Sequence, residues 1–488
     1  VLQLGQAAVL VVDLQRAHGD VLGFSNGAGG QHGAQVPLGS VTVACPQGGS
    51  GGAGIGGGQK STGQTTVTIK DGTIKEALGG NLGDGIGGGS DSTNITVNIE
   101  GGRIETAQGG KGDKFHDAGD GIHSDKALTI SGKATIVSAI GGGCDNDATN
   151  RNAGHGIYSG GDLTIETGSN IGTAKGGDAT ASNKNGGDGI HSNGKIEIKG
   201  TIETAQGGNG ISRGGDGIYS QDNLTISDSA TITNAKGGDS SSVTGTGGAG
   251  ICSGGELIIS QSATSKGATI GIAQGGTATG SSGTGGAGIR SYSSLTIGNA
   301  TIGIAKGGSG KTTGGHGIHS KGDLTISGGT IGSWKANGKT PDTDTGALGG
   351  TAEAGAKGGR GIHSDGKIDI TGGEIVNAKG GDGKVSSYSS SRGDGIYSAK
   401  TLTITDSTIG NAQGGSGRNG GTGIYSDSDL VISGKAFIQN AKGGDSWMRG
   451  GDGIHSTGIL TIKDDAKIEK AQGGTGKSGG AGIYSEGD

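Results

Sequence analysis

A tetrapeptide of the form Gly-Ile-His/Tyr-Ser, with close variants, recurs along the chain and constrains the fold more than any other feature. Its isoleucine stands at fourteen positions: Ile55, Ile86, Ile122, Ile157, Ile190, Ile218, Ile251, Ile289, Ile318, Ile362, Ile396, Ile424, Ile454 and Ile483. The spacing between successive copies ranges from 28 to 44 residues, with a mean near 33. A period of about 20 to 50 residues is typical of repeat architectures, so the chain is expected to stack similar units.

Each repeat carries three short strand-like segments at fixed offsets. In eleven successive copies an aliphatic residue lies six positions after the motif isoleucine, as Leu128 follows Ile122. It opens a Leu-Thr-Ile run whose alternation points the aliphatics inward and Thr outward. A further Ile and an Ala three positions beyond it follow in most copies, as in Ile202 and Ala205. Lys or Gln and then Gly-Gly come next, and the length varies only after them, so the variable loops should leave from one corner.

These segments are too short and too regularly interrupted by Gly for a sandwich or barrel. Stacking remains, and we predict an all-β parallel β-solenoid of about 14 coils, with three short strands per coil and variable Gly-rich loops at one corner. A right-handed crossover is expected for parallel connections. Collagen is excluded because the 121 glycines of the 488 residues have no three-residue period and only three prolines occur.

The domain boundaries follow from where the repeat is present. Residues 1–50 do not match it, and we expect a cap or a partial first coil there, because the apolar run at 7–12 is too short for a membrane span. Residues 51–488 are predicted to form the solenoid repeat domain, with an insertion at 334–357 that contains Trp334 and Pro341. The sequence stops within a repeat, so further repeats or modules of the same parent chain are expected partners.

Charge and cysteine content exclude several functions. The formal net charge of −6 is dispersed, which argues against nucleic acid as a partner, and no membrane insertion is expected. Cys45, Cys144 and Cys252 lie far apart and form no metal-ligand spacing, so no metal is expected.

Two histidines stand in Gly-His-Gly triplets, the type of sequence found in pectin-cleaving β-helix hydrolases. These are His155 and His316, and other repeats hold Asp, Ala, Arg or Thr in the same slot. Glycoside hydrolysis needs two carboxyls around one bond, and no such pair is marked out in the sequence. We therefore predict no catalytic residue. A polysaccharide lyase or glycoside hydrolase on a β-helix stays the alternative, because stacked loops could assemble a site from residues about 33 apart.

The Gly-Gly-Asp-Gly runs are similar to calcium-binding nonapeptide repeats, but their period is several times too long. We interpret Asp188, Asp216, Asp394 and Asp452 as solvated turn residues. No cofactor is expected, with calcium as the alternative.

Two outward ladders are candidate binding surfaces. The first consists of His and Tyr side chains that could contact sugar rings or could simply stack on one another between coils: His123, Tyr158, His191, Tyr219, His319, His363, Tyr397, Tyr425, His455 and Tyr484. The second is a Thr row such as Thr129, Thr164 and Thr225, which suggests ice binding as a remote alternative. Residues such as Glu197 and Asp369 interrupt it, and Thr is favoured in strands in any case.

The glycine-rich units at 52–58 and 83–89, followed by Thr-Ile strands, resemble repeats of large bacterial cell-surface proteins, a style often labelled adhesin-like or carbohydrate-binding, with a superhelix like that of pectate lyases. The resemblance covers nearly the whole chain after residue 50. It implies an extracellular or cell-surface location. We expect a non-catalytic structural rod or adhesin segment of a larger surface protein, with weak binding to polysaccharide or to host and matrix glycans.

Overall fold

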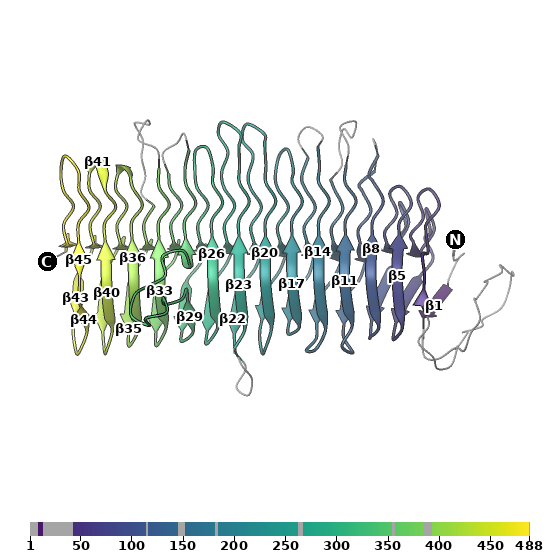
Figure 1. Ribbon diagram of the computed structural model, residues 1–488, viewed down its shortest axis with the longest axis horizontal. Helices are drawn as coiled ribbons and strands as arrows, with labels where there is room; N and C mark the ends of the chain where they lie inside the picture. Colours follow the sequence, from purple (N-terminus) through teal and green to yellow (C-terminus); the bar gives the residue numbers. More distant parts are fainter. Residues whose placement is uncertain are drawn as a thin grey trace. The chain divides into compact units, whose positions relative to one another are not determined.

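The chain folds as a parallel β-solenoid, which confirms the predicted fold class. The computed structural model describes residues 8–12, 42–113, 116–144, 152–180, 184–261, 267–353, 357–383 and 393–487. They divide into two compact units, unit 1 (Val1–Ile211 and Ile218–Gln221) and unit 2 (Ser212–Gly217 and Asp222–Asp488). In both units each coil contributes to three parallel sheets, and the variable loops leave on one side of the strands (Figure 1). No helix that could cross a membrane occurs in the part of the chain that the structure describes.

We name the three sheets after their most regular residues. The ring sheet holds the Gly-Ile-His/Tyr-Ser strands, the threonine sheet holds the Leu-Thr-Ile strands, and the alanine sheet holds the longer strands that contain the repeat alanine. Equivalent residues lie in register in adjacent coils, as Ile122, His123 and Ser124 do with Ile157, Tyr158 and Ser159.

The strands of unit 1 follow the same order in all three sheets. The ring sheet contains β3 (Ile55–Gly56), β6 (Ile86–Gly87), β9 (Ile122–Ser124), β12 (Ile157–Ser159), β15 (Ile190–Ser192) and β18 (Ile218–Ser220). The threonine sheet contains β1 (Ala8–Val12), β4 (Thr65–Ile69), β7 (Ile95–Ile99), β10 (Leu128–Ile130), β13 (Leu163–Ile165) and β16 (Ile196–Ile198). The alanine sheet contains β2 (Thr42–Val43), β5 (Thr73–Leu78), β8 (Arg103–Gln108), β11 (Thr135–Ile140), β14 (Asn170–Lys175) and β17 (Thr201–Gln206).

Unit 2 repeats this arrangement. Its ring sheet contains β21 (Ile251–Ser253), β24 (Ile289–Ser291), β27 (Ile318–Ser320), β31 (Ile362–Ser364), β34 (Ile396–Ser398), β38 (Ile424–Ser426), β42 (Ile454–Ser456) and β46 (Ile483–Ser485). Its threonine sheet contains β19 (Leu224–Ile226), β22 (Leu257–Ser260), β25 (Leu295–Gly298), β28 (Leu324–Ser327), β32 (Ile368–Thr371), β35 (Leu402–Thr405), β39 (Leu430–Ser433) and β43 (Leu460–Ile462). Its alanine sheet contains β20 (Thr231–Lys236), β23 (Thr269–Gln274), β26 (Thr301–Lys306), β29 (Thr330–Ile331), β30 (Gly346–Leu348), β33 (Glu374–Lys379), β36 (Thr408–Gln413), β40 (Phe437–Lys442), β44 (Lys467–Ile468) and β45 (Ala471–Gln472).

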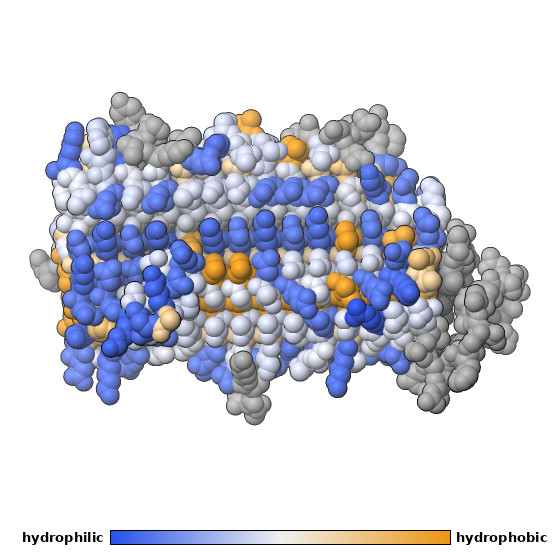
Figure 2. Space-filling view, viewed as in Figure 1, coloured by the Kyte–Doolittle hydropathy of each residue, from blue (hydrophilic) through white to orange (hydrophobic). Residues whose placement is uncertain are grey.

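The core is the column of aliphatic side chains that the repeat predicts. Leu128 and Ile130 are fully buried, whereas Thr129 between them is exposed, so the Leu-Thr-Ile alternation is confirmed. Ile202 and Ala205 are likewise fully buried in β17. The outer face of the alanine sheet shows rows of like side chains, most of them hydrophilic or intermediate in hydropathy (Figure 2).

The glycines serve a second purpose, which the sequence did not reveal. At the base of the loops two extended segments of each coil meet backbone to backbone. Some of their amides donate to the facing segment of the same coil, and others donate to a carbonyl of the preceding coil. In unit 1, Gly177 donates to Gly154 (2.8 Å) and Gly187 donates to Gly177 (3.0 Å). A Cβ added at Gly177 would lie 2.0 Å from the carbonyl oxygen of Gly142. We call this region the glycine collar, and no side chain larger than hydrogen fits at these positions.

Two segments depart from the regular coil. β1 pairs in parallel with β4, so the first of the described N-terminal residues form a strand of the threonine sheet. The insertion predicted at 334–357 is narrower in the structure, because β30 rejoins the alanine sheet beside β26 and β33. The excursion between β29 and β30 lies against the outside of that sheet, where the Trp334 indole donates to Glu374 at 2.8 Å.

Candidate functional site

Most side chains of the repeat that could act as an acid, a base or a nucleophile lie at the corner that links each loop to the ring sheet. Three rows run along it. We call them the slot row (the residue two positions before the motif isoleucine), the ring row (the His/Tyr position) and the serine row (the last residue of the motif).

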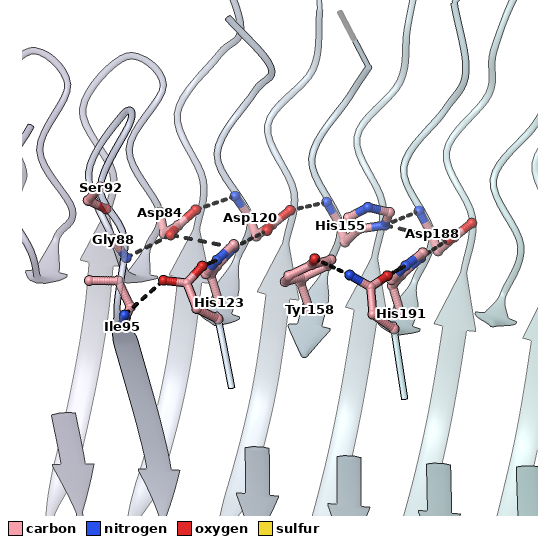
Figure 3. A network of polar contacts seen from close by, with 12 residues as sticks. Asp84, Gly88, Ser92, Ile95, Asp120, His123, His155, Tyr158, Asp188 and His191 are labelled. Atoms are coloured by element: carbon pink, nitrogen blue, oxygen red, sulfur yellow. Dashed lines mark hydrogen bonds and ion pairs between the residues drawn. The ribbon is translucent and has the colours of Figure 1, made fainter. Parts of the chain in front are cut away.

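The slot row caps backbone amides. In unit 1, Asp84 Oδ1 accepts the amide N–H of Asp120 at 2.7 Å, and Asp120 Oδ1 accepts that of His155 at 2.6 Å. His155 continues the row, because its Nδ1 accepts the amide of Asp188 at 2.9 Å (Figure 3). Each of these three slot residues thereby satisfies an amide that would otherwise lack a partner.

The same contact recurs in unit 2 and corrects one prediction. Asp394 Oδ1 accepts the amide of Thr422 at 2.8 Å, and Asp452 Oδ1 accepts that of Ala481 at 2.7 Å. The interpretation of Asp188, Asp216, Asp394 and Asp452 as solvated turn residues is wrong: all four are buried, and Asp216 is 0% exposed. The carboxylates of Asp216, Asp394 and Asp452 each accept an amide of the neighbouring coil.

The rings of the ring row stack from His123 to Tyr219 in unit 1 and from His319 to Tyr484 in unit 2. Ring centroids of register neighbours lie 4.6 to 5.4 Å apart, close to the coil spacing of about 4.8 Å. Of the ten predicted contact residues, His319, His363 and His455 are buried and Tyr484 is exposed. The other six are half-buried: His123, Tyr158, His191, Tyr219, Tyr397 and Tyr425. The faces of these rings therefore contact one another, and only their edges reach the surface.

The serine row is a feature that the sequence reasoning missed. In Ser320, which is fully buried, the hydroxyl lies 3.0 Å from the carbonyl oxygen of Ser293 in the preceding coil and 2.9 Å from that of Asp323. Ser159, Ser398 and Ser426 make equivalent contacts. The invariant position of Ser in the motif was the signal that could have revealed this role.

Slot and ring rows join into Asp–His pairs where the slot holds Asp and the ring position holds His. Asp120 Oδ2 lies 2.6 Å from His123 Nδ1, and Asp188 Oδ2 lies 2.6 Å from His191 Nδ1 (Figure 3). In unit 2 the same pair forms between Asp452 and His455 at 2.8 Å. The slot carboxylate thus uses one oxygen for the backbone and the other for a ring.

The pKa values of Asp84 and His123, which lie close together at this corner, are both shifted from their usual values. Burial raises the pKa of Asp84 to about 7, although His123 opposes the shift. Burial alone would lower the pKa of His123, but the carboxylates of Asp84, Asp120 and Asp125 outweigh it and raise that pKa well above its usual value.

A carboxyl group with a raised pKa beside an ionised carboxylate is the arrangement found in catalytic acid–base pairs. Here, however, Asp84 and Asp120 are both buried, and both bond to backbone amides. These carboxyls therefore stabilise the stack instead of facing a substrate bond.

Three groups bring metal-binding residue types together. They are Asp84, Asp120 and His123; His155, Asp188 and His191; and His316, His319 and His363. In the last two groups the slot histidine accepts a backbone amide through Nδ1, from Asp188 in one and from Arg360 in the other. Its remaining nitrogen therefore carries the proton and offers no lone pair to a metal.

In unit 2 the proton-bearing Nε2 of His316 donates to His363 Nδ1 at 3.2 Å, and His363 Nε2 in turn faces Asp365 Oδ1 at 3.0 Å. Burial and the cations Arg290, Lys321 and Arg360 lower the pKa of His319 to about 3. Burial also lowers the pKa of His316 and His363, so the three histidines are neutral near pH 7.

The loops beyond the collar carry the most exposed aromatic surface. β37 (Gly417–Asn419) and β41 (Ser446–Arg449) pair there as a small sheet outside the three main ones. Trp447 in β41 is 54% exposed, and the ammonium of Lys477 lies 4.6 Å from its ring centroid. This indole was not singled out as a binding residue from the sequence.

No protein-family model matches the chain, nor does any curated protein or solved structure.

Proposed function

We propose that this protein is a non-catalytic structural segment of a larger cell-surface protein, and that its exposed aromatic side chains contact glycans. The observation that carries the proposal is the use of the polar side chains at the corner. Asp, His and Ser, the residues that a hydrolase or lyase would need, bond from coil to coil in both units. Their regular repetition supports a role in building the stack.

Glycan contact is supported by the loop side. Trp447 offers an exposed indole face beside the ammonium of Lys477. Aromatic rings with one face open to water are suited to the apolar C–H face of a sugar, and a neighbouring cation suits hydroxyl or acidic groups. The surface location rests on the resemblance of the glycine-rich units to repeats of bacterial surface proteins.

The test incubates the purified chain overnight with pectin, mucin glycans and plant and bacterial polysaccharides, followed by size-exclusion chromatography. We expect polymers of unchanged length and co-elution of at least one of them. The variant W447A should weaken co-elution, whereas V243A, which trims an aliphatic side chain that is 62% exposed, should not. Shortened polymer would refute the non-catalytic role and favour the lyase or hydrolase alternative. Equal binding by W447A would refute the contact through Trp447.

A further inference from the structure

One position of the ring row in unit 2 carries a cation instead of a ring. Arg290 occupies the ring position of β24 and lies in register with His319 of β27. Two residues after it, Tyr292 is 41% exposed. The guanidinium carbon of Arg290 lies 4.7 Å from the Tyr292 ring centroid, and the ammonium of Lys321 lies 4.6 Å from it. An accessible aromatic ring is thus flanked by two positive charges.

These donors lack acceptors among the described residues. Neither Arg290 nor Lys321 forms an ion pair or hydrogen bond there, and Arg290 Nε is buried without a hydrogen-bond partner. His319 is 5% exposed, and neither of its ring nitrogens has a hydrogen-bond partner. Its nearest carboxylate oxygen, Asp365 Oδ2, lies 3.6 Å from Nε2, beyond hydrogen-bond range. Buried polar groups of this kind destabilise the folded state when they are unsatisfied.

Arg360, another cation of this region, differs from Arg290 because it has a carboxylate partner. Arg360 donates through Nε to Asp394 at 3.0 Å. In the coil of Arg290 the slot residue is Ala287, which offers no carboxylate. The charges around Tyr292 therefore favour an anion supplied from outside.

We propose that Arg290, Lys321 and Tyr292 form a subsite for an acidic sugar residue of a polysaccharide, with His319 as a neutral donor at its base. The sugar contacts the exposed part of Tyr292, and its carboxylate or sulfate accepts hydrogen bonds from the guanidinium and the ammonium that lie over the ring. The planar guanidinium fork matches both oxyanions. The inference deepens the glycan contact proposed above and rests on it.

The experiment measures binding of immobilised full-length chain to polygalacturonate, dextran sulfate and neutral dextran at low salt. We expect at least one charged polymer to bind about tenfold more tightly than dextran, and the double variant R290Q/K321Q to lose about tenfold of that affinity. Y292A should weaken binding while leaving both charges in place. K367Q is the matched control, because it removes a lysine charge from the same unit at a site already paired with Asp369 at 2.9 Å.

Each outcome decides the proposal. Unchanged binding by R290Q/K321Q, or no preference of the wild-type chain for a charged polymer, overturns the subsite. Full competition by the same concentration of sodium sulfate also overturns it, because a free ion would then suffice. The thermal unfolding midpoint of each variant shows whether the fold is intact. The failure of the proposed function is seen separately, as shortened polymer with the wild-type chain.

Discussion

Replacing one glycine of the collar tests the physical basis of the stack. In unit 2, Gly308 donates its amide to Gly286 at 2.8 Å, and its carbonyl accepts the amide of Gly315 at 2.9 Å. A Cβ at Gly308 would lie 1.9 Å from the carbonyl oxygen of Gly276. Since real Cβ contacts are essentially never shorter than 3.0 Å, the two backbones must separate by at least 3.0 − 1.9 = 1.1 Å.

Such a separation moves Gly308 away from the preceding coil and breaks its hydrogen bond to Gly286 of that coil, which leaves one donor and one acceptor buried without partners. At about 1 to 3 kcal/mol for each, G308A should lower the free energy of unfolding by about 2 to 6 kcal/mol. The matched control is G479A, because a Cβ at Gly479 meets only one atom, 3.9 Å away. Replacing Gly by Ala in open space should leave stability unchanged or raise it slightly.

Urea unfolding followed by circular dichroism gives the midpoint of each variant, and hydrogen exchange reports the amide of Gly308. We expect a lower midpoint and faster exchange in G308A only. A midpoint equal to that of wild type, with that amide still protected, would refute backbone-to-backbone packing of the collar.

Three further predictions concern the corner in unit 2. S320A should lower the free energy of unfolding by about 1 to 3 kcal/mol, because two carbonyls lose a buried donor, whereas S281A on an exposed loop should not; urea midpoints compare them. D394A should destabilise more than D394N, which keeps an acceptor for the Thr422 amide, and equal losses would contradict the capping role. Burial and nearby cations hold the pKa of His319 at about 3, below its unfolded value near 6.5. The folded state therefore binds fewer protons, and stability should fall as pH drops below 6.5, by about 2 kcal/mol at pH 5 from this residue alone. H319Q should flatten that dependence in unfolding curves recorded between pH 7.5 and 5.

The coil could be predicted from the sequence because its pattern is local. The six-residue offset from Ile122 to Leu128 and the Leu-Thr-Ile alternation are set by side-chain periodicity within one strand or turn. Burial of Leu128 and Ile130 follows directly.

The polar rows could not be predicted because their partners lie in another coil. Asp216 follows two glycines and was interpreted as a turn residue, yet its Oδ1 accepts the amide of Ala249, 33 residues away. The collar bond from Gly177 to Gly154 also joins different coils. The spacing showed which residues stack but not which atoms of a stacked pair meet.

The slot residue of a coil decides whether a charged residue of the ring row has a carboxylate partner within the protein. Where the ring position holds His, the slot Asp three positions earlier pairs with it, as Asp188 does with His191. Asp120 and Asp452 do the same and cap an amide of the next coil with their other oxygen. Where the slot is Ala287, the residue three positions later is Arg290, and no internal carboxylate meets it. The alanine in the slot of this coil therefore leaves the cation of its ring position without a carboxylate partner. This coupling makes Arg290 the position from which an external anion should be bound.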